Sequence, residues 1–215
     1  KSGNGKTSQE VNTQYEYDMS DIIGQFQAKR ALEISAAGQH NVLLNGPPGT
    51  GKSMLAKALP SILPPLTRAE MLMVTHLHSL AHNQFEEIVA IRPFRSPHHS
   101  ASNAAIIGGG SNPRPGEVSL AHCGVLFLDE LPEFNRSTIE ALRQPLEDKT
   151  ISVARAKDRL NYPADFILIG TKNPCPCGYY GTDKPCICAP HAINQYEKKL
   201  SGPILDRIDL YVDVE

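Results

Sequence analysis

The feature that most constrains the fold of this 215-residue chain is a glycine-rich octapeptide that follows a short apolar run. The octapeptide fits G-x-x-x-x-G-K-[ST] and consists of Gly46, Pro47, Pro48, Gly49, Thr50, Gly51, Lys52 and Ser53. Its glycines let the backbone curl so that N–H groups face phosphate oxygens, and a helix N-terminus behind it adds positive potential. With a strand predicted over residues 41–44 and a helix from about Gly51, the sequence predicts a nucleotide site. Lys52 is then expected to reach the β- and γ-phosphates, and the Ser53 hydroxyl to coordinate Mg²⁺.

A second motif completes this site. Four apolar residues at 125–128 predict a buried strand, and Asp129 and Glu130 follow it directly. Ligands of open α/β sheets bind at the carboxyl ends of the strands, where these two carboxylates are expected to lie. Asp129 is the predicted holder of Mg²⁺, and Glu130 the predicted base that orients and deprotonates the attacking water.

The pattern along the chain predicts one α/β domain with a parallel sheet, because short apolar runs alternate with segments of helical spacing. Strands are expected at residues 41–44, 125–128, 166–170 and 210–214. Helices are expected over residues 25–37, from Gly51, from Thr67, from Asn135, and over 193–200. Residues 88–121, rich in proline and glycine, and residues 151–160 predict inserted hairpins.

Composition limits the partners and the setting. The 21 basic and 23 acidic residues give a net charge of −2, so any contact with nucleic acid has to use a local basic patch. No apolar run is long enough to span a membrane. Residues 1–18 are polar and are interpreted as a linker from an upstream domain, which leaves residues 19–215 for the core. A cytoplasmic, reducing setting is expected, so the five cysteines favour a metal over disulfides.

Several motifs resemble the AAA+ ATPases. Residues 21–25 (DIIGQ), the octapeptide and the acidic pair match that superfamily at large. Residues 94–99 (FRSPHH), 108–110 (GGG), 113–117 (PRPGE), 173–178 (NPCPCG) and 205–210 (LDRIDL) resemble its magnesium-chelatase-like branch, and within it the ComM (YifB) family of bacterial competence proteins.

This resemblance implies a sheet of order 5-1-4-3-2 with helices on both faces, and a homo-hexameric ring. It also implies ATP and Mg²⁺ as cofactors, and an ATP-driven DNA helicase that promotes branch migration during natural transformation. Members of the family carry an upstream Lon-protease-like domain and a downstream helical lid, and neither is expected within this sequence.

The resemblance also assigns roles to single residues. Ile22 and Ile23 match positions that contact the nucleotide, and Asn173 matches the sensor that polarises the attacking water. Arg207 matches an arginine finger that acts on the ATP of a neighbouring subunit. Thr171 and Lys172 depart from the pattern, which has small residues and a methionine in front of the sensor. Two other interpretations stay open, namely a turn role for Asn173 before a proline and a surface ion pair of Arg207 with Asp206 or Asp209.

Four cysteines form two close pairs, Cys175 with Cys177 and Cys186 with Cys188. Four thiolates close a tetrahedral Zn²⁺ site, although C-x-C spacing is less usual than C-x₂-C, and His191 is a possible replacement for one of them. A loop of reduced thiols held by prolines is the other interpretation. Neighbouring histidines His98 and His99 are expected to serve a loop rather than a metal.

Three basic residues alternate along the second predicted hairpin, namely Arg155, Lys157 and Arg159. Alternate residues of a strand share one face, so this hairpin is a candidate DNA contact, and an ordinary solvated face is the equal alternative. Three functions are therefore compared, namely a DNA-remodelling motor, a chelatase-type motor for metal insertion into a tetrapyrrole, and a nucleotide-gated assembly module with negligible turnover.

Overall fold

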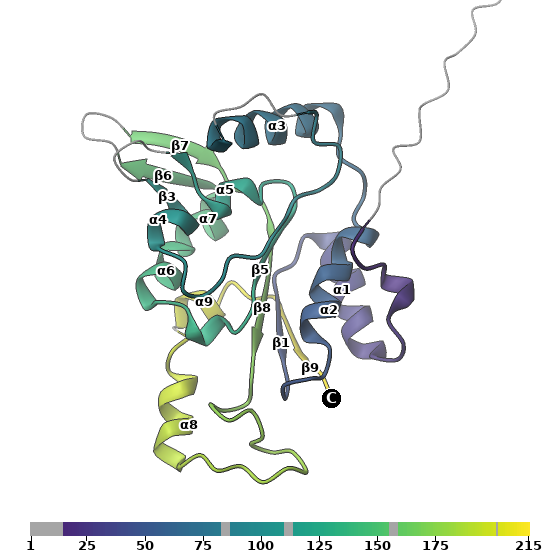
Figure 1. Ribbon diagram of the computed structural model, residues 1–215, viewed down its shortest axis with the longest axis vertical. Helices are drawn as coiled ribbons and strands as arrows, with labels where there is room; N and C mark the ends of the chain where they lie inside the picture. Colours follow the sequence, from purple (N-terminus) through teal and green to yellow (C-terminus); the bar gives the residue numbers. More distant parts are fainter. Residues whose placement is uncertain (1–14, 83–86, 110–113, 155–158, 201) are drawn as a thin grey trace, which may run out of the picture.

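A five-stranded parallel sheet forms the centre of the molecule (Figure 1). The computed structural model describes residues 15–82, 87–109, 114–154, 159–200 and 202–215. From one edge to the other, the strands are β2 (Phe94–Arg95), β5 (Val125–Leu128), β8 (Ile167–Lys172), β1 (Val42–Asn45) and β9 (Leu210–Asp213). Strands β5 and β8 carry almost only buried side chains, as expected for a parallel sheet covered on both faces.

The predicted strand order is confirmed. Counted among themselves along the chain as 1 to 5, the five strands lie in the order 2-3-4-1-5, which is 5-1-4-3-2 read from the other edge. The order places β1 between β8 and β9, with Leu43 beside Gly170 and Tyr211. The ends of β1, β5 and β8 therefore meet at one edge of the sheet, where the polar motifs follow.

Two hydrophobic cores cover the two faces of this sheet, and β1 contributes to both. Val42 and Leu44 belong to the core beneath α1 (Phe26–Gly38) and α2 (Lys52–Ala58). The next residue, Leu43, faces the opposite core, because successive side chains of a strand point to opposite faces. That second core is covered by short helices, which are α4 (Asn103–Ile107), α5 (Glu117–Leu120), α6 (Arg136–Ala141), α7 (Arg143–Asp148) and α9 (Gly202–Leu205).

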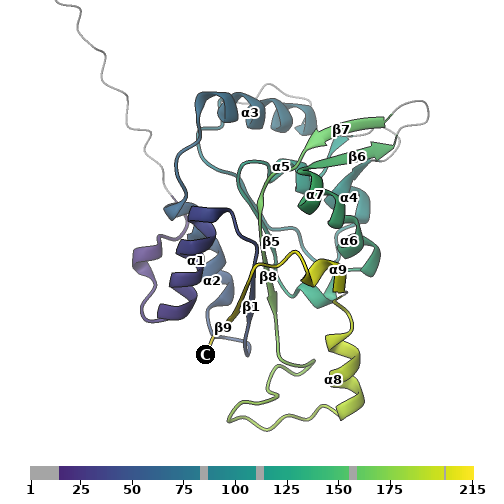
Figure 2. The ribbon, with the colours of Figure 1, turned by 180° about the vertical axis from the view of Figure 1, so that it is seen from behind.

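Both predicted hairpins are present. Strands β3 (Gly108–Gly109) and β4 (Arg114–Pro115) pair antiparallel, and so do β6 (Thr150–Ala154) and β7 (Arg159–Pro163). Helix α3 (Arg68–His82) lies at the same end of the molecule, and α8 (Pro190–Glu197) lies at the opposite end (Figures 1 and 2). A capping box forms at Thr67, where the helix was expected to begin, since the Thr67 and Glu70 side chains each accept a hydrogen bond from the other's backbone N–H.

Two sequence expectations need correction. Phe94–Arg95 is the edge strand of the main sheet rather than part of an inserted hairpin. The helix expected from Asn135 is two short helices, α6 and α7, that meet at Leu142. Asn135 does occupy the N-cap position of α6, but its side chain makes no capping hydrogen bond.

The proposed linker at residues 1–18 lies mostly outside the described residues. Within the described ranges, no helix combines the length and the apolar character that crossing a membrane requires.

Candidate nucleotide-binding site

The glycine-rich loop connects β1 to α2 at the carboxyl edge of the sheet. Gly49 and Gly51 have φ angles of 87° and 83°, a left-handed conformation that is costly for residues with a Cβ atom. The backbone of Gly46 lies against the carbonyl of Val214, so a side chain there has no room. The chain can therefore curl at this point only because glycine occupies these positions.

Lys52 lies at the centre of this loop. Its Nζ donates hydrogen bonds to the carbonyl oxygens of Gly46 at 2.6 Å and Pro47 at 2.7 Å. The side-chain oxygen of Asn173 accepts a third, at 3.3 Å. Burial lowers the pKa of Lys52, and the negative charges of Asp129 and Glu130 oppose that shift. Its ammonium group is thus held in place at the side of the cleft where an anion would bind.

Asp129 is fixed by hydrogen bonds to both of its carboxylate oxygens. The Ser53 hydroxyl donates to one oxygen at 2.9 Å, and the Thr171 hydroxyl donates to the other at 2.6 Å. A hydroxyl beside a carboxylate is the donor set that P-loop enzymes use for Mg²⁺, so Ser53 and Asp129 fit that ion. The hydrogen bond of Thr171 to Asp129 was not predicted from the sequence, where Thr171 is only a departure from the family pattern.

Glu130 has a left-handed backbone, with a φ angle of 53°. Its N–H donates to the Thr171 hydroxyl at 2.8 Å, which holds this uncommon conformation in place. The Glu130 side chain is exposed and lines an open cleft together with Lys52, Asp129 and Asn173. Such a carboxylate is accessible to water and can accept its proton.

Asn173 follows β8 directly and is held from two sides. Its side-chain oxygen faces Lys52, and its backbone N–H donates to the hydroxyl of Tyr196 at 3.3 Å. Burial raises the pKa of Tyr196 to about 12, so that phenol stays protonated at neutral pH. The residue expected to be the sensor therefore lies in the same cleft as the predicted phosphate and metal ligands.

A histidine loop borders the same acidic pair. Residues 96–99 line a cleft together with Asp129 and Glu130. The His98 and His99 rings lie 4.1 Å apart between centroids, and His99 meets the Phe134 ring edge-on. Sequence reasoning assigned these histidines to a loop but missed their position beside the site. The missing signal was β2, since the loop follows the carboxyl end of that strand.

Ile22 and Ile23 differ in environment. The Ile22 side chain is buried in the core beneath α1 and α2, whereas Ile23 is 94% exposed. The nearby Gln25 side chain donates to the carbonyl oxygen of Thr50 at 3.5 Å, so this segment borders the glycine-rich loop. Neither isoleucine is among the described residues that line the cleft.

Arg207 lies outside this cleft. Its guanidinium pairs with Glu147 and donates to the carbonyl oxygen of Pro203 at 3.2 Å. Its own carbonyl accepts a hydrogen bond from the Asn41 side chain at 2.9 Å, at the amino end of β1. The alternative ion pair with Asp206 or Asp209 is thus replaced by one with Glu147. Arg207 thus lies at the end of β1 opposite to the glycine-rich loop.

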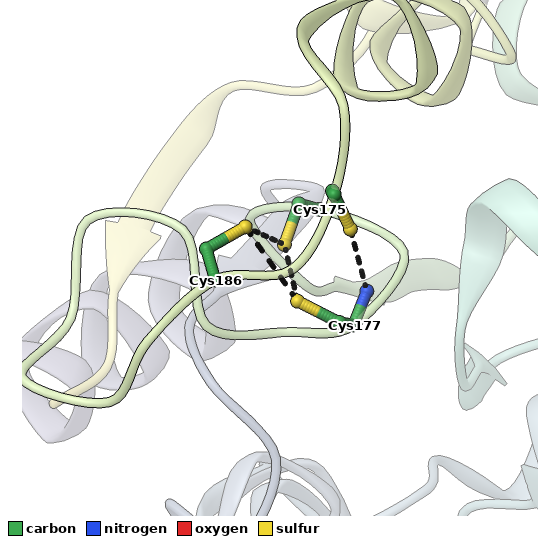
Figure 3. Close-up of side chains that lie close together, drawn as sticks. Cys175, Cys177 and Cys186 are labelled. Atoms are coloured by element: carbon green, nitrogen blue, oxygen red, sulfur yellow. Dashed lines mark hydrogen bonds between the residues drawn. The ribbon is translucent and has the colours of Figure 1, made fainter.

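The four clustered cysteines come together in the loop between β8 and α8. Figure 3 shows the sulfur atoms of Cys175, Cys177 and Cys186 pointing toward one another. The four sulfurs, including that of Cys188, lie within 4.8 Å of one another, and His191 is not part of the group. Hydrogen bonds from the backbone N–H groups of Tyr179 and Ile187 lower the pKa of Cys177 to about 6.

The basic side chains proposed for DNA lie outside the described side chains. Residues 155–158, with Arg155 and Lys157, are not described, and Arg159 is described only through its backbone in β7. The hairpin that carries them, β6–β7, is present.

The sheet order, the glycine-rich loop after β1 and the acidic pair after β5 together define an ATP-binding domain of the AAA+ type. A family model described as "Magnesium chelatase, subunit ChlI" matches residues 18–215, and the chain therefore belongs to that family.

Within the family, proteins called YifB and ComM are much more similar to the chain than chelatase subunits are. YifB of Salmonella typhimurium is 52% identical over 198 residues, which cover 92% of the chain and 39% of that protein. Competence protein ComM of Haemophilus influenzae is 52% identical over 199 residues, with the same coverage of 92% and 39%. A magnesium-chelatase 67 kDa subunit of Heliobacterium mobile is 26% identical, over 76% of the chain and 29% of that subunit. The chain thus spans well under half the length of these relatives.

Solved structures share the fold at lower identity. A model of the complex between subunits BchI and BchD of magnesium chelatase superposes with a TM-score of 0.65 at 23% identity, covering 94% of the chain and 62% of its counterpart. NtrX of Brucella abortus in complex with ADP superposes with a TM-score of 0.58 at 17% identity, covering 90% of the chain and 36% of NtrX.

Proposed function

We propose that the chain is the ATP-hydrolysing motor domain of a cytoplasmic ring ATPase that remodels DNA. The observation that carries the proposal is the convergence of Lys52, Asp129, Glu130 and Asn173 on one cleft. Their partners are already in place, because Thr171 and Ser53 orient Asp129 and Asn173 lies within hydrogen-bond reach of Lys52. Preorganised charges of this kind supply most of the catalysis in phosphoryl transfer.

In the proposed mechanism, each side chain has one task. Lys52 and the loop N–H groups would bind the phosphates, and Ser53 and Asp129 would hold Mg²⁺, whose charge would stabilise negative charge on the phosphate oxygens. Glu130 accepts a proton from the attacking water, and Asn173 orients that water. The adenine is proposed to rest against the exposed apolar side chains of Ile23 and Phe26, which are 94% and 82% exposed and flank Gln25 beside the loop.

The position of Arg207 supports the proposed assembly into a ring. Residues that line the cleft include no arginine among those described, whereas a transferring phosphoryl group gains from one in the transition state. Arg207 lies at the opposite end of β1 and is proposed to complete the site of the next subunit in a homo-hexameric ring.

The DNA role rests on the similarity to competence protein ComM and on the β6–β7 hairpin with Arg155, Lys157 and Arg159. Branch migration by a helicase is the activity proposed for the full-length protein. A chelatase-type motor is disfavoured by the lower identity to the chelatase subunits, 26% against 52%. A module with negligible turnover is disfavoured by the presence of Lys52, Asp129, Glu130 and Asn173 in one cleft.

The test compares two variants of the full-length protein. Lys52→Ala should abolish ATP binding, because it removes the phosphate clamp. Glu130→Gln should retain binding and lose hydrolysis by about 10²-fold or more, as expected for a general base. Nucleotide affinity and turnover are measured with and without branched DNA.

Each outcome separates one part of the proposal. Wild-type turnover in Glu130→Gln would contradict the assignment of Glu130 as the general base. Turnover that no DNA structure changes would contradict the DNA role and leave the ATPase intact.

A further inference from the structure

The loop that follows Asn173 is long and has little regular structure. Residues 173–189 form neither helix nor strand, and the Ile187 and Tyr180 side chains are 87% and 55% exposed. Ordering a loop of this length costs conformational entropy, and without an apolar core another interaction must offset that cost. The interior of the loop is formed instead by cysteine side chains, and Cys175 is fully buried.

The sulfur atoms are spaced for a single metal ion. The Sγ of Cys175 lies 3.4 Å from that of Cys177 and 3.7 Å from that of Cys186. A disulfide needs about 2.05 Å between sulfurs, so these contacts are too long to be one. Four thiolates at 2.3 Å from one Zn²⁺ ion lie about 3.8 Å apart at tetrahedral angles. A polynuclear iron–sulfur centre would spread its thiolates around several metal atoms.

Backbone N–H groups also point at these sulfurs. Cys177 N–H donates to the Cys188 sulfur at 3.4 Å, and Tyr180 N–H donates to the Cys175 sulfur at 3.3 Å. Such hydrogen bonds orient thiolate ligands and offset their charge in metal sites. Loop backbone and sulfur positions are therefore matched to one cation.

From this geometry we infer that Cys175, Cys177, Cys186 and Cys188 bind one structural Zn²⁺ ion, which fixes the loop that positions Asn173 against the glycine-rich loop. Two contacts transmit the constraint. The Tyr196 hydroxyl, in the helix after the cysteines, accepts the backbone N–H of Asn173. Gly178, between the two cysteine pairs, lies directly against the Pro48 ring. The positioning part of this inference rests on the proposed ATPase function, whereas the metal site does not.

The metal site is tested on full-length protein purified without chelators. Elemental analysis should find one zinc per chain, and Co²⁺ exchanged into the site should give the visible absorption of a tetrahedral thiolate complex. Cys186→Ser and Cys188→Ser should weaken zinc binding by more than ~10–100-fold, which is the effect of losing a residue that only hydrogen-bonds to a metal ligand. Cys123→Ser is the matched control, because Cys123 lies outside the cluster and should retain the metal.

The positioning role needs a separate readout. In the zinc-depleted variants, kcat for ATP should fall on the order of tenfold to a hundredfold, because small displacements of a positioning group have that effect. Far-UV circular dichroism and nucleotide binding should be retained, and Co²⁺ spectra report the site independently of activity.

Specific outcomes overturn each part. Wild-type protein without metal, with all four thiols reacting freely, would overturn the site, and so would an iron–sulfur spectrum. Normal kcat in a zinc-free variant would overturn the positioning role alone. Zinc-loaded wild type without ATPase activity would contradict the proposed function and leave the zinc site standing.

Discussion

Gly178 in the cysteine loop lies against the ring of Pro48 in the glycine-rich loop, although the two residues are far apart in the sequence. A Cβ atom at Gly178 would come within 2.6 Å of Pro48 Cδ. This contact joins the outer wall of the nucleotide site to the segment that follows β8.

The first prediction tests this contact. Gly178→Ala should weaken ATP binding, because the added methyl group displaces Pro48, and should lower stability by about 1–2 kcal/mol through its left-handed backbone, with a φ angle of 86°. Gly181→Ala is the matched control, since its φ angle is 76° and no atom lies within 4 Å of its Cβ position. Isothermal titration and chemical denaturation measure both effects. Equal ATP affinity in the two variants would mean that the Pro48 contact has no role in binding.

A second prediction concerns Thr171, which is 1% exposed and bonds to both Asp129 and the Glu130 backbone. Thr171→Val keeps the shape and removes the hydroxyl, so stability should fall by about 1–3 kcal/mol because buried polar partners lose their hydrogen bonds. Turnover should fall more than ATP affinity, since both carboxylates lose orientation. Thr171→Ser should restore both properties, and a Val variant as active as wild type would remove Thr171 from the site.

A third prediction concerns Arg207. Arg207→Ala should lower turnover by ~10³-fold without weakening ATP binding, as removal of an arginine finger does. Mixing Arg207→Ala subunits with Lys52→Ala subunits should restore part of the activity. An Arg207→Ala subunit keeps an intact nucleotide site, and a neighbouring Lys52→Ala subunit supplies the arginine to it.

The matched control for Arg207 is Glu147→Gln, which removes the ion-pair partner and keeps the arginine. The pair is partly exposed, with side-chain exposures of 27% and 35%, so its own contribution to stability is under about 1 kcal/mol. If Glu147→Gln lowers turnover as much as Arg207→Ala, the arginine acts through that pair and not in trans.

A fourth prediction concerns pH. Burial lowers the pKa of His122, which accepts the backbone N–H of Asp165 through Nδ1 at 3.1 Å. The folded protein thus favours neutral His122, and the unfolded chain binds a proton more readily. The stability that this histidine contributes is therefore present above its unfolded pKa of about 6.5, and it is lost as the pH falls through the lower folded value.

The corresponding measurement is urea denaturation of wild type and His122→Gln at about pH 7.5 and about pH 5.5, which lie on either side of the unfolded histidine pKa of about 6.5. The wild type should lose more stability on acidification than the variant does. The same loss in both proteins would assign the pH dependence to other groups.

The glycine-rich loop and the acidic pair were predictable from the sequence because their chemistry is local. Gly49 and Gly51 need a particular backbone, and Asp129 and Glu130 follow an apolar run that ends at one sheet edge. Strands β5 and β8 were predicted for a similar reason, since continuous burial requires continuous apolar residues. The strand order came from the resemblance rather than from periodicity.

Other features depend on tertiary contacts that no local pattern encodes. Phe94–Arg95 is only two residues long, too short for any periodicity, and it pairs with β5 through two register positions. Thr171 gained its role because β8 lies beside β5, which places its hydroxyl next to Asp129. The break between α6 and α7 falls near Pro145. A proline favours a break in a helix, but the sequence alone does not say at which residue the break occurs.

Strand β1 has a mechanical consequence. Its carboxyl end continues into Gly46, and at its amino end the side chain and backbone of Asn41 bond to the carbonyl of Arg207 and the carboxylate of Asp209. The strand between them lies inside the sheet with Val42, Leu43 and Leu44 buried, and it spans about 13 Å at ~3.3 Å per residue. A displacement of the phosphate-binding loop along β1 would therefore also strain the hydrogen bonds that hold the backbone of Arg207.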